Sequence, residues 1–402
     1  MEEKMLGHNL SVTVNLSVYD KDGKLVSNIQ PPKEIPVSED HIDFLVREAS
    51  GVLIKKETIS FKSFNRNFMG LLDYGFGIRP AIAVTMSDGS KYSSNVGTML
   101  ESNAPVSNSL YGILVGTGSS PQSWLDYKLG GLCTSGILTR QLTYGSTTPL
   151  DYVTSGSVKY FRSSRTFKND WSASISIKEV GYMTKQTVVN KYMLISRDLV
   201  NFDSTPLDIA IAPTQTLEVV YSMGFDTNDG WVNNWFLLLS GSARLVTQTY
   251  TAVGNVPYSV SHVSINQDYF YNIAFESGVF PTGIAVGTSD VPVSMSDYNL
   301  GSIINHGTGS GELIYGNTTY VSAAESMVSQ SINSNIIRKF INNSGNDIVI
   351  KEVGAICGAK TTYNPSDACN VMLIRKVITP VTVRNTESVN VGFTFGVSSS
   401  IV

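Results

Sequence analysis

The sequence predicts a mainly β protein of two tandem homologous antiparallel domains, β-sandwich or jelly-roll-like, with a few short helices. Three observations predict it. A long segment of the chain recurs about 170 residues further on, which is the size of a domain. Several segments alternate apolar and polar residues, as half-buried strands do. The composition combines 42% hydrophobic with only 15% charged residues and includes 34 glycines, a mixture that suits short strands joined by tight turns.

The repeat is clearest where residues 112–148 align with residues 283–319 without a gap. Of these 37 positions, 17 are identical. Four further pairs of segments match at slightly different offsets: 67–72 with 234–239, 177–181 with 350–354, 193–195 with 372–374, and 217–225 with 389–395. Small changes of offset are expected where loops differ in length between repeats.

The repeat defines the expected domain organisation. Residues 1–100 hold an N-terminal β-hairpin, further strands and short helices, with membership of the first unit left open. Residues 101–226 form the first β-sandwich repeat, and residues 227–402 form the second. The first 60 residues are also a candidate anchor to a neighbouring protein.

Local patterns predict the elements of the N-terminal part. Residues 10–18 alternate as a half-buried strand, and Asp22-Gly23 is a hairpin signal before the return strand. Ser38 can cap a short helix that reaches residue 49. An amphipathic stripe of apolar residues within 61–72 predicts a second helix.

Charge gives little support for a nucleic-acid partner. The formal net charge is −4, and the densest basic cluster is Lys159, Arg162, Arg165 and Lys168, interleaved with aromatic residues. A solvated strand and loop face explains this cluster. We therefore expect no nucleic-acid binding.

The cysteines and the apolar runs bear on location. Cys133, Cys357 and Cys369 lack metal-like spacing and cannot all pair, so we expect reduced thiols in a protein assembled in a cytosol. The N-terminus shows no apolar segment of a signal peptide, and no apolar run reaches the length of a membrane-spanning helix.

The residues that could carry catalysis do not form a convincing constellation, so we expect no enzyme and no catalytic residue. The four histidines are far apart in sequence: His8, His41, His262 and His306. The acids Asp126 and Glu179 recur as Asp297 and Glu352, which suggests two equivalent environments rather than one catalytic pair. We expect the aspartates to cap turns and the glutamates to pair with neighbouring charges.

Two loops raise the possibility of ligand binding. Residues 116–120 superficially resemble a phosphate-binding loop but lack its Lys-Ser/Thr ending, so we interpret them as a turn that binds no anion. Three oxygen-bearing residues of the second unit could in principle hold Ca²⁺: Asp290, Asp297 and Asn299. The first unit has Ser119, Asp126 and Lys128 at these positions, and a lysine is a poor neighbour for a cation. We expect no metal and no cofactor.

The repeated motifs carry a resemblance. They are Ile-x-Val-Gly-Thr, Asp-Tyr-x-Leu, Leu-x-Tyr-Gly, Ile-Lys-Glu-Val-Gly and a Met-Leu-Ile strand with arginine close behind. Over residues 112–225 and 283–395 the chain resembles modules in tail, fibre and head-associated structural proteins of tailed phages. In the first unit a serine separates Met-Leu-Ile from Arg197, whereas Arg375 follows the motif directly. The resemblance implies a non-enzymatic virion protein that forms a homo-oligomer, and it implies no functional residues.

The expected function is therefore that of a virion component, assembled in the host cytoplasm, that contacts itself and other virion proteins. One alternative is a module that binds a host receptor or glycan, with a shallow aromatic site around Trp124 or around Trp231 and Trp235. A double jelly-roll capsid subunit is a second alternative. A virion hydrolase ranks last because no constellation of residues supports it.

Overall fold

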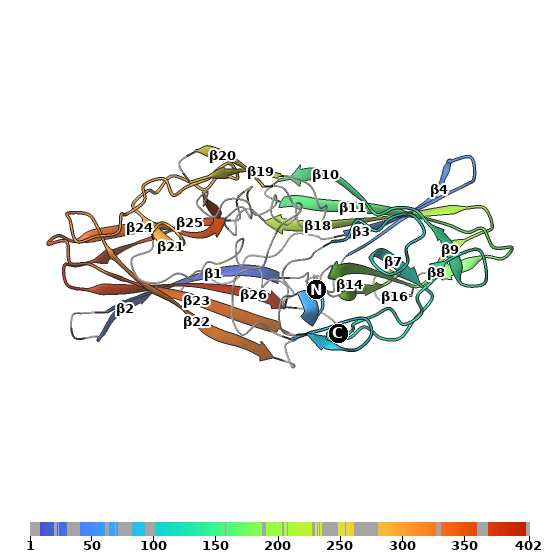
Figure 1. Cartoon of the computed structure of the whole chain (residues 1–402), viewed down its shortest axis with the longest axis horizontal. Helices are drawn as coiled ribbons and strands as arrows, with labels where there is room; N and C mark the ends of the chain where they lie inside the picture. Colours follow the sequence, from blue (N-terminus) through green and yellow to red (C-terminus); the bar gives the residue numbers. More distant parts are fainter. Residues whose placement is uncertain are drawn as a thin grey trace, which may run out of the picture.

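The computed structural model shows an elongated, mainly β molecule (Figure 1). The green strands of residues 112–226 lie at one end of the long axis, and the orange and red strands of residues 283–398 lie at the other. The structure describes residues 9–19, 22, 24–29, 41–60, 64–68, 70, 83–92, 101–156, 158–186, 190–202, 205–206, 208–226, 230, 232, 234, 248–253, 255–260, 280–326, 331–359 and 369–398.

The first half comprises strands β3 to β18 and contains one large and one small main sheet. The large sheet has the order β4 (Leu53–Ser60), β3 (His41–Arg47), β18 (Thr216–Asp226), β11 (Val158–Lys168), β9 (Gln141–Tyr144) and β8 (Thr134–Ser135), with β10 (Thr148–Ser155) also paired to β11. The small sheet has the order β14 (Lys191–Leu199), β13 (Glu179–Gln186) and β7 (Gly112–Gly116). All of these pairings are antiparallel except that of β8 with β9.

The second half comprises β1 and β2 together with β19 to β26. Its large sheet has the order β2 (Leu25–Ile29), β1 (Asn9–Tyr19), β26 (Ser388–Ser398), β23 (Ser331–Ile341) and β22 (Ile314–Ser326). Its small sheet has the order β21 (Gly283–Gly287), β24 (Ile348–Ala359) and β25 (Cys369–Val383). Four two-stranded pairs complete the two halves: β5 (Val84–Thr85) with β6 (Lys91–Tyr92), β12 (Ile175–Ile177) with β17 (Ile209–Ile211), β15 (Asn201–Phe202) with β16 (Thr205–Pro206), and β19 (Gln248–Ala252) with β20 (Val256–Val260).

The N-terminal 60 residues supply one hairpin to each half. β3 pairs with β18, whereas β1 pairs with β26, so the dark-blue β1 lies among the red and orange strands in Figure 1. Both hairpins carry an irregularity at the same point, between Val18 and Tyr19 in one and between Val46 and Arg47 in the other. This segment is thus paired within its own chain and not held free as an anchor, and only part of residues 1–100 joins the sheet of the first half.

The helix expected over residues 38–49 is wrong where the structure describes this segment. His41–Arg47 is strand β3, because Phe44 and Val46 alternate with less buried neighbours and pack into the core. The helix expected within 61–72 is reduced to a short helical stretch that begins at Arg66. Phe64, one residue of the predicted stripe, forms a β-bridge with Ser196 instead. Packing against the sheets overrides the local helical signal in both places.

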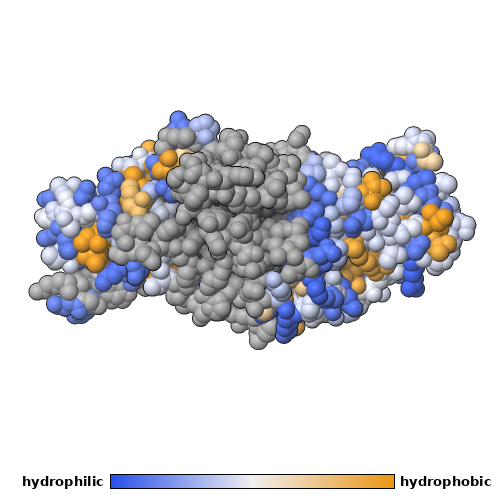
Figure 2. All heavy atoms as spheres, in the orientation of Figure 1, coloured by the Kyte–Doolittle hydropathy of each residue, from blue (hydrophilic) through white to orange (hydrophobic). Residues whose placement is uncertain are grey.

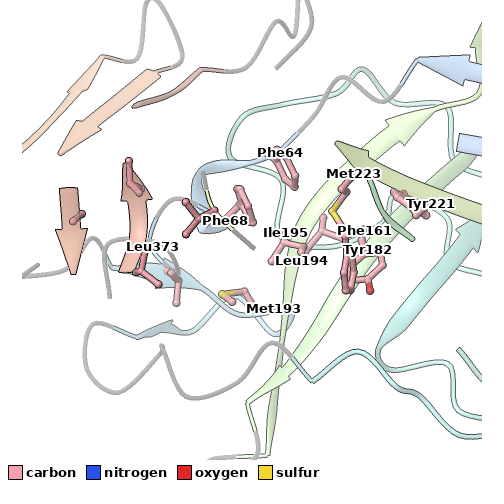
Figure 3. Packing of buried hydrophobic residues seen from close by; sticks show 14 of the residues in the cluster. Phe64, Phe68, Phe161, Tyr182, Met193, Leu194, Ile195, Tyr221, Met223 and Leu373 are labelled. Atoms are coloured by element: carbon pink, nitrogen blue, oxygen red, sulfur yellow. The ribbon is translucent and has the colours of Figure 1, made fainter. Parts of the chain in front are cut away.

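The hairpin expected at the N-terminus is confirmed, as is the mainly β, antiparallel character of the chain. The described apolar residues form a cluster that draws on both halves. Figure 3 shows its centre, where Phe161, Tyr182, Tyr221 and Met223 lie close together. The rings of Phe64 and Phe68 stack with their centroids 3.8 Å apart. The boundaries between domains stay a prediction.

Candidate functional site

A buried cluster of three charged residues is the most conspicuous polar feature of the first half. The Nε atom of Arg197 on β14 lies 2.7 Å from Oε2 of Glu179 on β13, and its Nη1 atom lies 2.8 Å from Oδ2 of Asp126. Glu179 and Arg197 are 0% and 2% exposed. Burial alone would lower the pKa of Arg197, but the hydrogen bonds to Asp126 and Glu179 raise it. We call these three residues the Glu–Arg–Asp cluster.

Backbone amides complete the surroundings of the glutamate. The amides of Gly118 and Gly131 donate to Oε1 of Glu179, at 3.1 and 2.5 Å, and the amide of Gly130 donates to Oε2 at 3.0 Å. A Cβ atom at Gly116 or Gly118 would lie within 2.5 Å of Oε1, so these close approaches require glycine. The expectation that residues 116–120 bind no anion is therefore wrong in one respect, because this loop receives an anion that belongs to the chain itself.

The second half repeats the cluster. Arg375 Nε lies 2.8 Å from Glu352 Oε2, and Arg375 Nη1 lies 2.9 Å from Asp297 Oδ2. The amides of Ser302 and Gly301 donate to Glu352 at 2.7 and 2.9 Å. The expected ion pairing of both glutamates is confirmed. The expected turn capping is confirmed as well, since each aspartate also accepts the amide of the residue three positions before it.

The strand register corrects one detail of the sequence alignment. Gly181 pairs with Arg197, and Gly354 pairs with Arg375, so the two arginines are equivalent at an offset of 178. The matched Met-Leu-Ile triplets, at an offset of 179, are therefore one residue out of structural register. No serine is inserted in the first unit, and identity of three apolar residues was a weaker guide than one buried charge.

A second arginine in each half is buried without a carboxylate contact among the described interactions. Arg165 on β11 is 1% exposed, and its guanidinium donates to carbonyl oxygens only. Its acceptors are the carbonyls of Gly145 (2.9 Å), Tyr111 (2.9 Å), Ile113 (3.0 Å), Pro105 (3.2 Å) and Asn108 (2.5 Å). Burial lowers the pKa of Arg165 to about 10, so the group is still charged at neutral pH. This arginine ties β11 to β7 and to the loop that precedes it.

Arg338 occupies the equivalent place in the second half. It donates to the carbonyls of Gly316 (2.9 Å), Thr282 (2.6 Å) and Ile284 (3.2 Å). The guanidinium carbon lies 4.8 Å from the centre of the Tyr315 ring, a cation–π contact. Sequence reasoning missed both arginines. The signal that would have found them is Arg-x-Phe-x-Asn, which begins at Arg165 and again at Arg338.

The asparagine of that motif also has one structural role in both halves. Asn169 Nδ2 donates to the carbonyls of Ala173 (2.9 Å) and Ile211 (2.7 Å). Asn342 Nδ2 makes the same pair of contacts, with Asn346 and Val383, both at 2.7 Å. These buried amides hold a loop against the end of the neighbouring strand, which is a structural task.

The remaining candidate residues do not come together as a site. Arg165 of the basic cluster points inward, which corrects the expectation of a solvated face, while Lys168 forms an exposed ion pair with Asp170. Of the histidines, His306 accepts the backbone amide of Tyr315 through Nδ1 at 3.0 Å. His8 and His262 lie outside the described residues, as does the side chain of His41.

The calcium and tryptophan candidates have ordinary structural surroundings where they are described. Asp297 is paired with Arg375, and the carboxylate of Asp290 lies 2.9 Å from Lys351 Nζ. Among the described residues no group of three or more His, Cys, Asp or Glu side chains is placed to hold a metal. Trp124 is 2% exposed and packs in the core. Trp231 and Trp235 fall outside the described part of the chain.

Two of the cysteines are free and buried. Cys133 and Cys357 are each 0% exposed. Burial, with a contribution from the negative charge of Glu179, raises the pKa of Cys133 to about 12. The thiolate is therefore scarce at neutral pH, and the group is inaccessible.

We expect iodoacetamide at pH 8 to leave Cys133 unlabelled in the folded protein and to label it fully in urea. Peptide mass spectrometry after a timed reaction measures both states. Free cysteine added to the same reaction controls for reagent activity. Complete labelling of Cys133 within minutes in the folded protein would contradict its burial.

The interior of the first half is more polar than that of the second at matching positions. The Tyr182 hydroxyl lies 3.1 Å from Ser163 Oγ and donates to Ser102 Oγ at 2.9 Å. The strand pairings make Ala355 and Ile336 the counterparts of Tyr182 and Ser163. These counterparts have no polar side-chain atoms, so this network is particular to the first half.

Exposed apolar side chains are also unevenly distributed over the described residues. Ile137 and Leu138 are 62% and 64% exposed, whereas the aligned residues of the second half are Thr308 and Gly309. The tip of the β3–β4 hairpin also exposes apolar side chains, including Val52 at 58%. Figure 2 shows several separate apolar patches at the end of the molecule formed by the first half.

Comparison of the chain with family models, curated proteins and solved structures found no significant match. Within the described residues, no helix has both the length and the apolar character needed to cross a lipid bilayer.

Proposed function

We propose that this chain is a non-enzymatic structural component of a tailed-phage particle, in the tail, in a fibre or on the head. In this proposal it assembles with copies of itself in the host cytoplasm and contacts other virion proteins. The observation that carries the structural role is the use of the repeated charged residues. In both halves the glutamate and its arginine hold loops against the small sheet and are turned away from solvent.

Two further observations support assembly. Apolar side chains such as Ile137 and Leu138 are exposed on one half and replaced by small or polar residues on the other, as expected of a surface that is covered in a larger particle. The buried free thiols of Cys133 and Cys357 suit a protein assembled in a reducing compartment. Placement in a phage particle is supported by the resemblance of the repeated motifs.

Light scattering of the purified full chain across a concentration series tests self-assembly. We expect a mass that is a fixed multiple of 43.6 kDa and that persists on dilution to the low micromolar range. A mass of 43.6 kDa at every concentration would overturn intrinsic self-assembly and would favour a module that is recruited by another protein or that binds a host receptor.

A further inference from the structure

The hairpin β1–β2 is joined to the second half by strand pairing rather than by a short chain connection. β1 pairs with β26 along its whole length, in 11 residue pairs from Asn9 with Ser398 to Tyr19 with Ser388. These strands lie at opposite ends of the sequence. In the chain direction, β2 is followed by β3, which belongs to the sheet of the other half.

The hairpin β3–β4 has the equivalent position but a different attachment. His41 pairs with Ser222 of β18 as Thr13 pairs with Thr394 of β26. After β4 the chain continues directly into the small sheet of the same half, where the Asn65 amide donates to the Ile195 carbonyl at 3.0 Å. The hairpin β3–β4 is therefore tied to the first half on both sides of its pairing.

The hairpin β1–β2 has a single connection, residues 30–40, and it leads away from the half that the hairpin completes. This connection contains Pro31, Pro32 and Pro36, whose fixed φ angles limit the ways in which it can turn back on its own chain. The contacts that β1 makes are the same whichever copy of the chain supplies it. Only the path of the connection distinguishes the two arrangements, which is the usual condition for exchange of a segment between copies.

Strand β26 needs a partner at this position. It alternates buried residues on its inner face, including Val389, Val391 and Phe393, each 0% exposed. Without β1 it would be an 11-residue edge strand with a row of unpaired backbone groups. Such an edge readily recruits another strand.

We propose that the hairpin β1–β2 is exchanged between copies, so that β1 of one chain pairs with β26 of a second copy. This inference deepens the proposed self-assembly and rests on it. Reciprocal exchange closes a symmetric dimer, and donation in one direction closes a ring. The hairpin is then the link that makes association of the copies stable.

A disulfide across the strand pair tests the exchange in the full-length chain. In the double variant Thr13→Cys with Thr394→Cys, the two cysteines face each other across the β1–β26 pair. We expect mild oxidation to give covalent species at about 87 kDa, twice the chain mass of 43.6 kDa, or at higher multiples. Peptide mass spectrometry identifies the 13–394 link and separates it from links to native cysteines.

The first half provides the matched control. The pair His41→Cys with Ser222→Cys occupies the equivalent register, and we expect its disulfide to form within one chain and leave the mass at 43.6 kDa. The single variant Thr13→Cys controls for random cross-linking.

The outcomes separate exchange from self-assembly. A 13–394 link confined to single chains would overturn exchange, and an oligomer seen by light scattering in the same sample would leave the proposed self-assembly standing. A monomer with that intrachain link would overturn both. Failure of residues 13 and 394 to link while the 41–222 pair does link would overturn the β1–β26 pairing and the exchange with it.

Discussion

Replacing Arg197 with methionine is expected to lower the free energy of unfolding by about 3–5 kcal/mol, because the Glu179 carboxylate then stays buried without its cationic partner. Methionine keeps much of the side-chain volume, so the loss reports on charge more than on packing. Arg375→Met is expected to have an effect of similar size, because Glu352 is equally buried. Urea unfolding followed by circular dichroism measures both. If the two halves unfold in separate transitions, each variant shifts a different one.

An exposed ion pair in the same half is the matched control for this result. Lys178 and Asp208 lie 3.7 Å apart with side chains 40% and 55% exposed. We expect Lys178→Met to change the free energy of unfolding by less than about 1 kcal/mol. Equal, small effects of Arg197→Met and Lys178→Met would contradict the structural role of the Glu–Arg–Asp cluster.

Arg165→Met is the second substitution with a large expected effect, again a loss of about 3–5 kcal/mol in the free energy of unfolding. It leaves five backbone carbonyls without their common donor, two of them, at Tyr111 and Ile113, beside the start of β7. We expect Arg165→Lys to lose at least about 2 kcal/mol, because a lysine ammonium has three donors on one atom and lacks the planar fork of a guanidinium.

The neighbouring Arg162 on β11 provides the control. It lies on the opposite face of the strand and is only partly buried, so we expect Arg162→Met to stay within about 0.5 kcal/mol of the parent protein. Arg338→Met tests the same role in the second half. An Arg165→Lys variant as stable as the parent would show that charge, and not the arrangement of five hydrogen bonds, is what the site requires.

Much of the candidate site could be predicted in kind but not in place. The recurrence of Glu179 as Glu352 indicated equivalent, ion-paired environments, and the structure confirms them. The partner arginines were visible in the sequence, yet alignment by apolar residues placed them one position apart. A β-strand repeats every two residues, so apolar identity alone does not fix register. The hydrogen-bonding demands of a buried guanidinium do fix it.

Glycine-rich loops show a similar limit. Residues 116–120 carry the close-approach glycines of an anion-binding loop, and the sequence correctly excluded a nucleotide-type motif. What it could not reveal is that Glu179, some 60 residues later, reaches into the loop. Only the pairing of β7 with β13 brings the carboxylate and the amides together.

The sequence by itself determined that the chain is mainly β, that it contains a repeat of about 170 residues, and that the glutamates pair with charges. Composition, alternation and internal identity are local properties, and each is readable without knowing which strands meet. The tertiary structure alone decided that the two N-terminal hairpins complete different sheets and that Arg165 and Arg338 are buried among carbonyls. These features depend on contacts between residues far apart in the chain, because the free energy of burying a strand edge or a charge is set by whatever covers it.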